Sequence, residues 1–245
     1  MAIGGKPLKI ATIYNSNNEA SRIYTKIKSR TARELGVLFE AHDVTDFQRV
    51  SEAIKVLNRD NEVQGIMVQL PLIDKKTDER LCQMIRKEKD VDGLNPVSKV
   101  IPATVRAAAA IISEGLSRTG KDGNWPLTMI VIGSKGNVGK GIMNFYKGDV
   151  RYKLIGAGRG EIRPEEVKRA DIVVSASGQT GLIVADMIKP GAVVVDIGYP
   201  GGDMRKDVET IAGFYTPVPG GVGPVTVAML YRNLADIAQL QVEMN

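Results

Sequence analysis

TMIVIGSKGNVG, residues 128–139, joins an apolar segment to a glycine-rich turn that precedes a predicted helix. Glycines let the backbone approach a pyrophosphate, and a helix N-terminus offers free N–H groups and the positive end of its dipole. The spacing is G-x-x-G-x-x-G rather than the strict dinucleotide-binding pattern, so an ordinary strand–turn–helix is the alternative. The position between a strand and a helix favours a nucleotide cofactor site.

Strand and helix patterns alternate in both directions from this loop. Further apolar strands are predicted at 8–14, 37–41, 63–70, 153–155, 171–175 and 192–197. This alternation indicates parallel sheets covered by helices on both faces. We therefore expect an α/β protein with two doubly wound domains, the second a Rossmann-type domain that binds NAD(P).

Local signals predict where helices begin and where the domains divide. Ser16-Asn17-Asn18-Glu19 has the spacing of a capping box and predicts a helix that runs to about Leu35. A small-residue helix is predicted at 107–112, and the polar, glycine-containing stretch 117–124 resembles a linker. The expected domains are residues 1–116, joined by a C-terminal helix at 225–245, and residues 117–224.

The composition excludes several classes of function. The single cysteine, Cys82, cannot form a disulfide within the chain, and with one histidine, His42, a zinc site or a Ser-His-Asp triad is hard to build. Cys82 falls on an apolar helix face and is expected to be a small buried hydrophobe. The net charge of +5 is scattered and only 5% of residues are aromatic, so nucleic acid is not an expected partner. No segment resembles a membrane span or a signal peptide, and a cytoplasmic location is expected.

The strand after the glycine loop bears on the choice of cofactor. Sites that prefer NAD commonly place Asp or Glu at its end, but here it ends in Leu154-Ile155-Gly156-Ala157-Gly158-Arg159. Lys135 and Arg159 could instead neutralise a 2′-phosphate, so the sequence favours NADP over NAD. Ser177-Gly178 and Tyr199 follow two later strands and would border the same crevice. Small residues at tight turns are the alternative there.

Candidate chemistry lies on the first helix, where Ser21, Tyr24 and Lys28 share one face. A Tyr and a Lys one turn apart can handle a proton, and desolvation of the amine would lower its pKa toward neutrality. From the spacing alone, a solvated polar face is the more frequent outcome.

Loops after other strands add polar groups. Gln69 ends a buried strand, and Lys89-Asp90-Val91-Asp92-Gly93 places two carboxylates in a turn. An amide and a carboxylate there could hydrogen-bond a heterocycle such as a pterin; alternatively, Asp90 and Asp92 only shape a turn with Gly93. The rigid stretch TPVPGGVGPVT, residues 216–226, would let a flat ligand lie against the backbone.

Together these segments resemble the bifunctional methylenetetrahydrofolate dehydrogenase and methenyltetrahydrofolate cyclohydrolase family. The resemblance runs from about Leu8 to the last helix, and its most specific pieces are VQLPL (68–72), KDVDG (89–93), TPVPGGVGP (216–224) and Ser21-x-x-Tyr24-x-x-x-Lys28. It implies two α/β domains that face each other across a cleft, with the last helix returning to the first domain, usually in a homodimer. It also implies oxidation of 5,10-methylenetetrahydrofolate with NADP or NAD, followed by hydrolysis to 10-formyltetrahydrofolate.

The resemblance implies roles for individual residues and no metal. The catalytic set would be Lys28, Tyr24, Gln69 and Asp92. The substrate set would be Tyr24, Asp92, Pro219, Gly223 and Thr226. The cofactor set would be Thr104, Gly133, Ser134, Lys135, Val138, Gly139, Gly158, Arg159, Ser177, Gly178 and Tyr199.

Three departures from the family pattern leave alternatives open. The usual P-C-T-P-x-G reads Pro-Ala-Thr-Val-Arg-Ala at 102–107, so the family's cysteine is absent. The usual G-R-S reads Gly-Ser-Lys at 133–135, and Gly158 stands where a serine is frequent. The competing hypotheses are a monofunctional dehydrogenase acting on a methylene-tetrahydropterin, and a nucleotide-binding module without catalysis.

Overall fold

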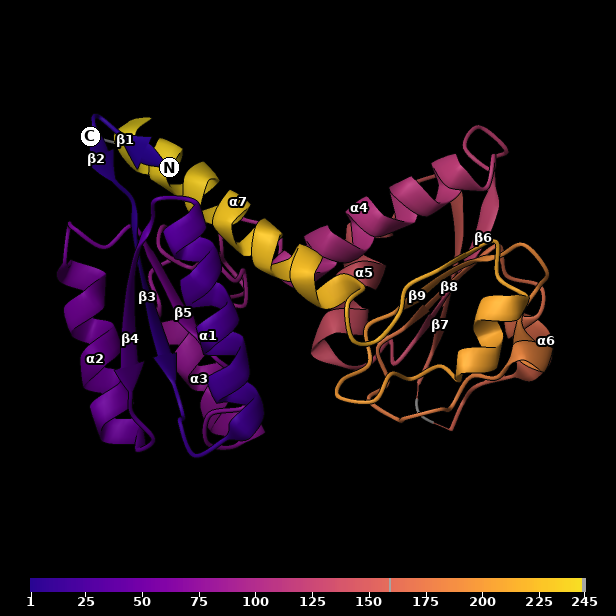
Figure 1. The fold of residues 1–245 in the computed structure, drawn as a ribbon, viewed down its shortest axis with the longest axis horizontal. Helices are drawn as coiled ribbons and strands as arrows, with labels where there is room; N and C mark the ends of the chain where they lie inside the picture. The colour runs from indigo at the N-terminus through magenta and orange to yellow at the C-terminus, as the bar shows by residue number, and fades with distance from the viewer. Residues whose placement is uncertain (159, 244–245) are drawn as a thin grey trace. The chain divides into compact units, whose positions relative to one another are not determined.

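The computed structural model describes residues 1–158 and 160–243 and shows an α/β chain (Figure 1). It divides into two compact units: the first holds residues 1–103 and the chain from 227 onward, and the second holds 104–226. The domain boundaries predicted from the sequence lie between residues 116 and 117 and between residues 224 and 225. The first division lies earlier because the helix at 103–118 packs on the second sheet, where Gly115 leaves room for the side chains of Val193 and Phe214.

The first unit is built on a three-stranded parallel sheet, as expected. Its strands are β3 (Lys9–Tyr14), β4 (Leu38–Asp43) and β5 (Gly65–Val68), and its helices are α1 (Glu19–Glu34), α2 (Phe47–Arg59) and α3 (Lys75–Met84). The strand order is β4-β3-β5, so the chain crosses to the other side of β3 between its second and third strands. A short antiparallel pair, β1 (Ala2–Ile3) and β2 (Lys6–Pro7), precedes the sheet and was not predicted.

Alternate side chains of the first sheet enter two separate cores. Ile10 and Met67 pack with helix α7 (Val222–Glu243), whereas Ile13 and Val68 pack with α2 and α3. This alternation is the two-residue period of a strand covered on both faces. Cys82 belongs to the second core, so its expected role as a buried hydrophobe is confirmed.

Helix α1 begins later than the capping-box spacing predicted. Its N-cap is Asn18, whose side chain accepts a hydrogen bond from the backbone N–H of Ser21. The prediction that Ser16 caps the helix is wrong, because the Ser16 hydroxyl and N–H both donate to the carboxylate of Asp43, at the end of β4. A tertiary partner therefore replaced the local one.

The second unit contains a five-stranded parallel sheet. Its strands are β6 (Leu127–Ile132), β7 (Tyr152–Ala157), β8 (Ile172–Ser175), β9 (Val193–Asp196) and β10 (Phe214–Tyr215). Its helices are α4 (Ala103–Arg118), α5 (Asn137–Tyr146) and α6 (Pro164–Val167), with 3-10 turns η1 (Ala185–Met187) and η2 (Lys206–Thr210). The order β7-β6-β8-β9-β10 is the doubly wound order 2-1-3-4-5, which confirms the Rossmann-type expectation.

Two features of the second unit differ from the sequence prediction. Helix α4 begins at Ala103 rather than Ala107 and continues to Arg118, into the stretch predicted as a linker. Strand β10 was not predicted, because two residues are too short to show a hydrophobic period.

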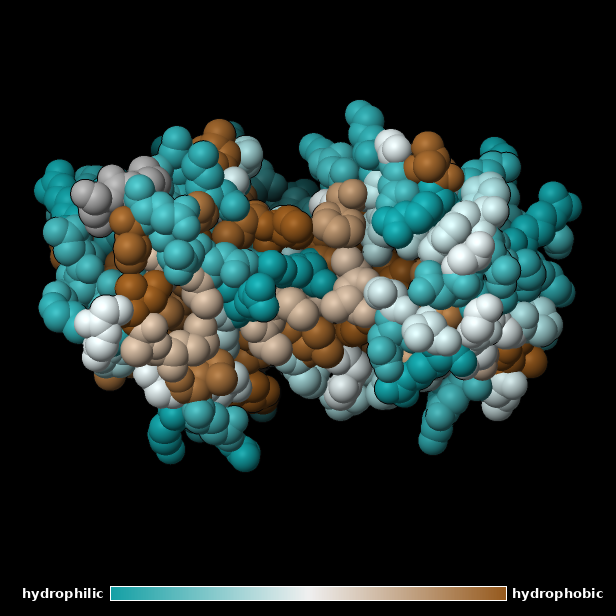
Figure 2. All heavy atoms as spheres, turned by 90° about the horizontal axis from the view of Figure 1, so that it is seen from above, coloured by the Kyte–Doolittle hydropathy of each residue, from teal (hydrophilic) through white to brown (hydrophobic). Residues whose placement is uncertain are grey.

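The surface of the molecule is mixed. Figure 2 shows hydrophilic side chains spread over the face in view, in keeping with the scattered charges of the sequence. Within the described parts of the chain, no helix is long and apolar enough to cross a membrane.

Candidate functional site

Lys28 is a buried amine on the inner face of α1. Only 8% of the residue is exposed, although its neighbours Lys26 and Ile27 face solvent. The Nζ atom donates to Oε1 of Gln69 at 2.7 Å and contacts Sδ of Met67 at 3.5 Å. The solvated polar face that spacing alone favoured is therefore wrong for Lys28 itself. Burial lowers the pKa of Lys28 to about 8, and the nearby charge of Asp92 acts in the opposite direction.

Gln69 is held so that its amide oxygen faces the lysine. Its backbone N–H donates to Ile13 at 2.8 Å, which continues the pairing of β5 with β3. Its Nε2 donates to the carbonyl of Leu70 at 3.2 Å. Since the nitrogen is engaged there, Oε1 is left to accept from Lys28.

Two further predicted residues lie around this amine. Tyr24 is half-buried one turn before Lys28 on α1. Asp92 is half-buried in the loop after β5 and α3, and burial raises the pKa of its carboxyl while Lys28 lowers it. The charges of Lys28 and Asp92 each act on the pKa of the other group, so the two groups lie near one another. The structure thus brings Lys28 and Gln69 into contact with Asp92 nearby, and Tyr24 lies one helical turn away on α1.

The two carboxylates of the KDVDG turn have different roles. Asp90 accepts hydrogen bonds from the backbone N–H groups of Gly93 and Asn95, at 3.0 and 2.8 Å. Gly93 has a φ of +71°, and a Cβ there would lie 2.7 Å from the backbone of Pro102. Asp90 therefore shapes the turn, as the alternative interpretation held, and the turn presents Asp92.

Two residues of α7 support the site and were not predicted. The Tyr231 hydroxyl donates to the backbone carbonyl of Lys28 at 2.6 Å. The Asn233 side chain donates to the carbonyls of Val91 and Ile101, both at 2.9 Å, on either side of the Asp92 loop. Both residues are almost wholly buried. The available signal was a tyrosine and an asparagine inside the most apolar part of the last helix.

The glycine loop of the second unit fits a dinucleotide. Gly133 has a φ of +79°, and a Cβ there would lie 2.4 Å from the carbonyl of Ala176. A Cβ on Gly139 would lie 2.2 Å from the carbonyl of Gly133, so both glycines are needed for close packing. Gly136 is the N-cap of α5 without a side-chain cap, which leaves N–H groups of the first turn for a ligand. The loop lies where strand order reverses, next to β8, which is where such folds bind nucleotides.

The loops after β8 and β9 are held by a buried polar network. One carboxylate oxygen of Asp203 accepts from the hydroxyls of Ser175 and Ser177, at 2.7 and 2.9 Å, and from the N–H groups of Ser177 and Gly178. Asp196 accepts the N–H groups of Gly198, Asp203 and Met204. This network holds Ser177 and Gly178 in place just after β8, at the carboxyl edge of the sheet, and their part in a cofactor site stays a prediction.

The other predicted residues of the second unit have varied positions. Thr104, Ser134 and Val138 are half-buried, and Tyr199 is 45% exposed. Gly158 directly follows β7 and Lys135 is paired with Glu161, while Arg159 lies outside the described residues. Pro219, Gly223 and Thr226 lie in or just after the turn that opens α7, and the Thr226 hydroxyl donates to the carbonyl of Val222. No group of His, Cys, Asp and Glu within 1–158 and 160–243 could hold a metal ion.

Comparison with known proteins identifies the family. Residues 2–92 match the sequence model "Tetrahydrofolate dehydrogenase/cyclohydrolase, catalytic domain", and residues 102–242 match the NAD(P)-binding domain of the same family. A "Bifunctional protein FolD" of Methanospirillum hungatei is 36% identical over 96% of this chain and 90% of its own length.

Solved structures agree with this match. A 5,10-methylenetetrahydrofolate dehydrogenase of the silkworm Bombyx mori superposes with a TM-score of 0.87 at 32% identity, over 98% of this chain and 90% of that one. A Trypanosoma brucei dehydrogenase-cyclohydrolase complexed with NADP superposes with a TM-score of 0.86 at 27% identity, over 98% and 89%. The resemblance stated from the sequence is confirmed: the chain belongs to the tetrahydrofolate dehydrogenase/cyclohydrolase family.

Proposed function

We propose that this enzyme oxidises 5,10-methylenetetrahydrofolate with a nicotinamide dinucleotide and hydrolyses the methenyl product to 10-formyltetrahydrofolate. The observation that carries the proposal is the buried Lys28 amine, 2.7 Å from Gln69 and with its pKa lowered to about 8. A lysine buried for packing alone would lower stability, and a dehydrogenase without hydrolysis would not need it.

The second unit supplies the cofactor site for the oxidation. The glycine loop at 133–139 would hold the pyrophosphate on backbone N–H groups, and the turns at Ser177-Gly178 and Tyr199 would line the crevice beside it. The bound dinucleotide supplies a hydride acceptor. The residues of this chain bind it, orient it and exclude water.

The first unit supplies the groups for hydrolysis. A water oxygen adds to the electrophilic methenyl carbon and loses a proton. The bond from that carbon to N5 then breaks as N5 takes up a proton, and the hydroxyl on the carbon loses its proton to become the formyl C=O, so one proton is released overall. Lys28 can accept the proton from water when its amine is neutral, and Gln69 fixes the position of that amine. Asp92 would hold the pterin, and Tyr24, one turn before Lys28, would contact it. The assignment of Pro219, Gly223 and Thr226, which belong to the second unit, to substrate binding stays a prediction from the family resemblance.

The division of labour is tested by Lys28→Met, with Lys26→Met as the matched control on the exposed face of the same helix. We expect Lys28→Met to lose hydrolysis by a factor of about 100 or more while some hydride transfer remains. The assays are dinucleotide reduction with methylenetetrahydrofolate and decay of methenyltetrahydrofolate. Equal loss of both activities in folded protein would contradict the proposal, and wild-type protein without hydrolysis would favour the monofunctional dehydrogenase.

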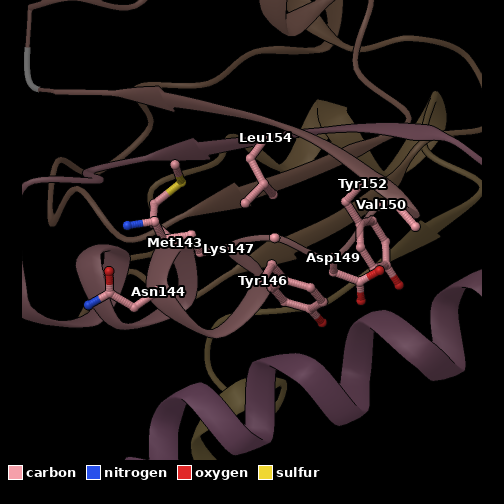
Figure 3. A pocket seen from close by; sticks show the side chains of 9 residues that line it. Met143, Asn144, Tyr146, Lys147, Asp149, Val150, Tyr152 and Leu154 are labelled. Carbon is pink, nitrogen blue, oxygen red and sulfur yellow. The ribbon is translucent and has the colours of Figure 1, made fainter.

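The sequence favoured NADP, a homodimer and a cytoplasmic location, and these remain proposals. NADP rested on Lys135 and Arg159, of which Lys135 is described and is paired with Glu161. The homodimer is supported by β7, the unpaired edge of the second sheet, beside the exposed side chains of Phe145 and Val150. A hollow of about 500 Å³ opens between the end of α5 and the start of β7 at this edge (Figure 3). The single buried cysteine suits a reducing compartment.

A further inference from the structure

The side chain of Glu161, three residues after Gly158, folds back so that its carboxylate lies at the end of β7. Oε2 of Glu161 accepts the backbone N–H of Gly158 at 3.0 Å, and Oε1 accepts from the Nζ of Lys135. The sequence shows no acidic residue at the end of this strand, because Glu161 lies in the loop that follows it. Two groups that bind anions, an ammonium and a backbone N–H, thus both donate to the chain's own carboxylate.

The glycine at position 158 makes this arrangement sterically possible. A Cβ built there would lie 2.7 Å from Oε2 of Glu161 and 3.2 Å from Cδ of Lys135. Any side chain at this position would therefore displace the carboxylate from the Gly158 N–H. Gly158 and Glu161 form a matched pair, and the departure noted in the sequence at Gly158 has a structural consequence.

The position of Lys135, Gly158 and Glu161 in the fold indicates which part of a dinucleotide they would contact. In a doubly wound domain the adenosine ribose lies beyond the end of the strand that follows the glycine loop, and an acidic residue about 20 positions after the loop binds its hydroxyl groups. Gly158 directly follows the last residue of that strand, Ala157, and Lys135 belongs to the glycine loop itself. The carboxylate of Glu161 consequently lies where the ribose 2′-position of a dinucleotide would come.

The ion pair between Lys135 and Glu161 contributes little to the stability of the fold. Lys135 is 72% exposed and Glu161 is 52% exposed, and an ion pair at such an exposed site adds little to stability. The hydrogen bond from Lys135 also lowers the pKa of the Glu161 carboxyl, so the group is ionised at neutral pH. An ionised carboxylate is therefore available to a ligand at low cost in folding free energy.

We propose that Glu161 determines cofactor specificity, because its carboxylate occupies the anion-binding position formed by Lys135 and the Gly158 N–H and so disfavours a 2′-phosphate. The ribose hydroxyls of NAD can donate to this carboxylate, whereas the phosphate of NADP must displace it and compete for Lys135. Glu161 thereby opposes the preference for NADP that Lys135 alone would give. This inference rests on the proposed function of the second unit as a dinucleotide site.

The test is direct binding of NAD and NADP to the full chain by calorimetry, without folate, so that the result is independent of catalysis. We expect Glu161→Gln to raise the affinity for NADP by about tenfold and to leave the affinity for NAD unchanged or lower. The matched control is Glu165→Gln, which removes the same charge from an exposed site at the start of α6. The gain should shrink as salt is raised, because charges at an exposed site are screened.

A second substitution separates the roles of the two side chains. Lys135→Met should reduce NADP affinity severalfold more in the Glu161→Gln background than in the wild-type background. The reason is that the Lys135 ammonium can bind the 2′-phosphate only when it is not paired with the Glu161 carboxylate. Gly158→Ala, which displaces the carboxylate, should change the NADP-to-NAD ratio in the same direction as Glu161→Gln. An unchanged ratio in Glu161→Gln, with both dinucleotides bound, would overturn the inference alone. Failure of wild-type protein to bind either dinucleotide would overturn the proposed function with it.

Discussion

The buried amine of Lys28 makes hydrolysis depend on pH in a defined direction. Its pKa is lowered to about 8, and the amine can accept a proton only in its neutral form. We expect the enzyme-catalysed rate to rise with pH and to level off above about 8. Since the charge of Asp92 raises the pKa of Lys28, Asp92→Asn should move this rise to lower pH. Initial rates of methenyltetrahydrofolate decay, corrected for the spontaneous reaction, measure both; a flat profile would exclude Lys28 as the base.

The same amine has a cost in stability. The pKa of Lys28 falls from 10.5 in the unfolded chain to about 8 in the folded one, so between these values the unfolded chain binds more protons. Stability therefore rises with pH across this window, and below pH 8 the folded state bears the full cost of burying the ammonium. We expect Lys28→Met to raise the free energy of unfolding at pH 7 by about 1–2 kcal/mol, less than the shift alone implies because Asp92 loses its counter-charge.

Urea denaturation at pH 7 and pH 10 measures this change, and the advantage of Lys28→Met should largely disappear at the higher pH. A less stable variant at pH 7 would show that the contacts of Lys28 with Gln69 and Met67 outweigh desolvation. The exposed Lys26→Met should have little effect at either pH. Stabilisation with loss of hydrolysis would be typical of a residue kept for function rather than folding.

Residue roles could be predicted where side chains share a local period. The spacing placed Tyr24 and Lys28 on one face of a helix, but burial of that face depends on β5 and α7, which are distant in the sequence. The same limit applies to KDVDG, where only the folded turn separates Asp90 from Asp92. Glu161 was missed because it lies in the loop after β7, and only the folded loop brings its carboxylate to the Gly158 N–H.

At the scale of elements, one hydrogen bond from α7 fixes the helix that carries the catalytic amine. Tyr231 donates to the carbonyl of Lys28, and Tyr231→Phe would leave that buried carbonyl without this donor. We expect Tyr231→Phe to lower the free energy of unfolding by about 1–2 kcal/mol. Without this hydrogen bond α1 can move, which would loosen the Lys28–Gln69 contact. Hydrolysis should therefore fall more than hydride transfer. Urea denaturation and the two activity assays measure these effects; unchanged stability and an equal fall in both activities would contradict them.

Most strands and helices were predictable, and the exceptions have physical causes. Apolar runs such as 127–132 are long enough to identify a buried strand, and β6 has those bounds. Helix α4 was predicted too short because its polar end at 113–118 lacks apolar periodicity, although its Gly115 packs closely on Phe214. Local capping signals at Ser16 gave way to a bond with Asp43 from another strand. Boundaries therefore depended on tertiary contacts.

At the scale of the whole chain, the two α/β units and the return of the last helix followed from the order of strands, helices and family segments. The first unit is completed by the chain from 227 onward, whose Tyr231, Leu234 and Ile237 enter one of its two cores. Sequence pattern shows that this helix is amphipathic but not which sheet it covers. A chain that ended before this helix would expose that core, so the first unit depends on both ends of the sequence.

The edge of the second sheet leads to a prediction about assembly. Among the described residues, strand β7 pairs with β6 on one side, and its other side is a sheet edge that offers N–H and C=O groups to a partner strand. Val150, just before it, is 90% exposed and Phe145 is 43% exposed, so an apolar surface adjoins the free edge. A second copy of the chain would cover both features at once. We therefore expect a dimer in solution, and Val150→Asp should weaken it by placing a charge within the contact.

Light scattering coupled to size-exclusion chromatography over a range of protein concentrations measures this equilibrium. Val97→Asp is the matched control, since Val97 is 63% exposed and belongs to the first unit, whereas β7 belongs to the second. We expect wild type and Val97→Asp to remain dimeric at concentrations where Val150→Asp is a monomer. Because Lys28 and the glycine loop lie within single units of one chain, the monomer should still bind a dinucleotide. A wild-type monomer, or a Val150→Asp dimer as tight as wild type, would show that the edge of β7 is not the contact.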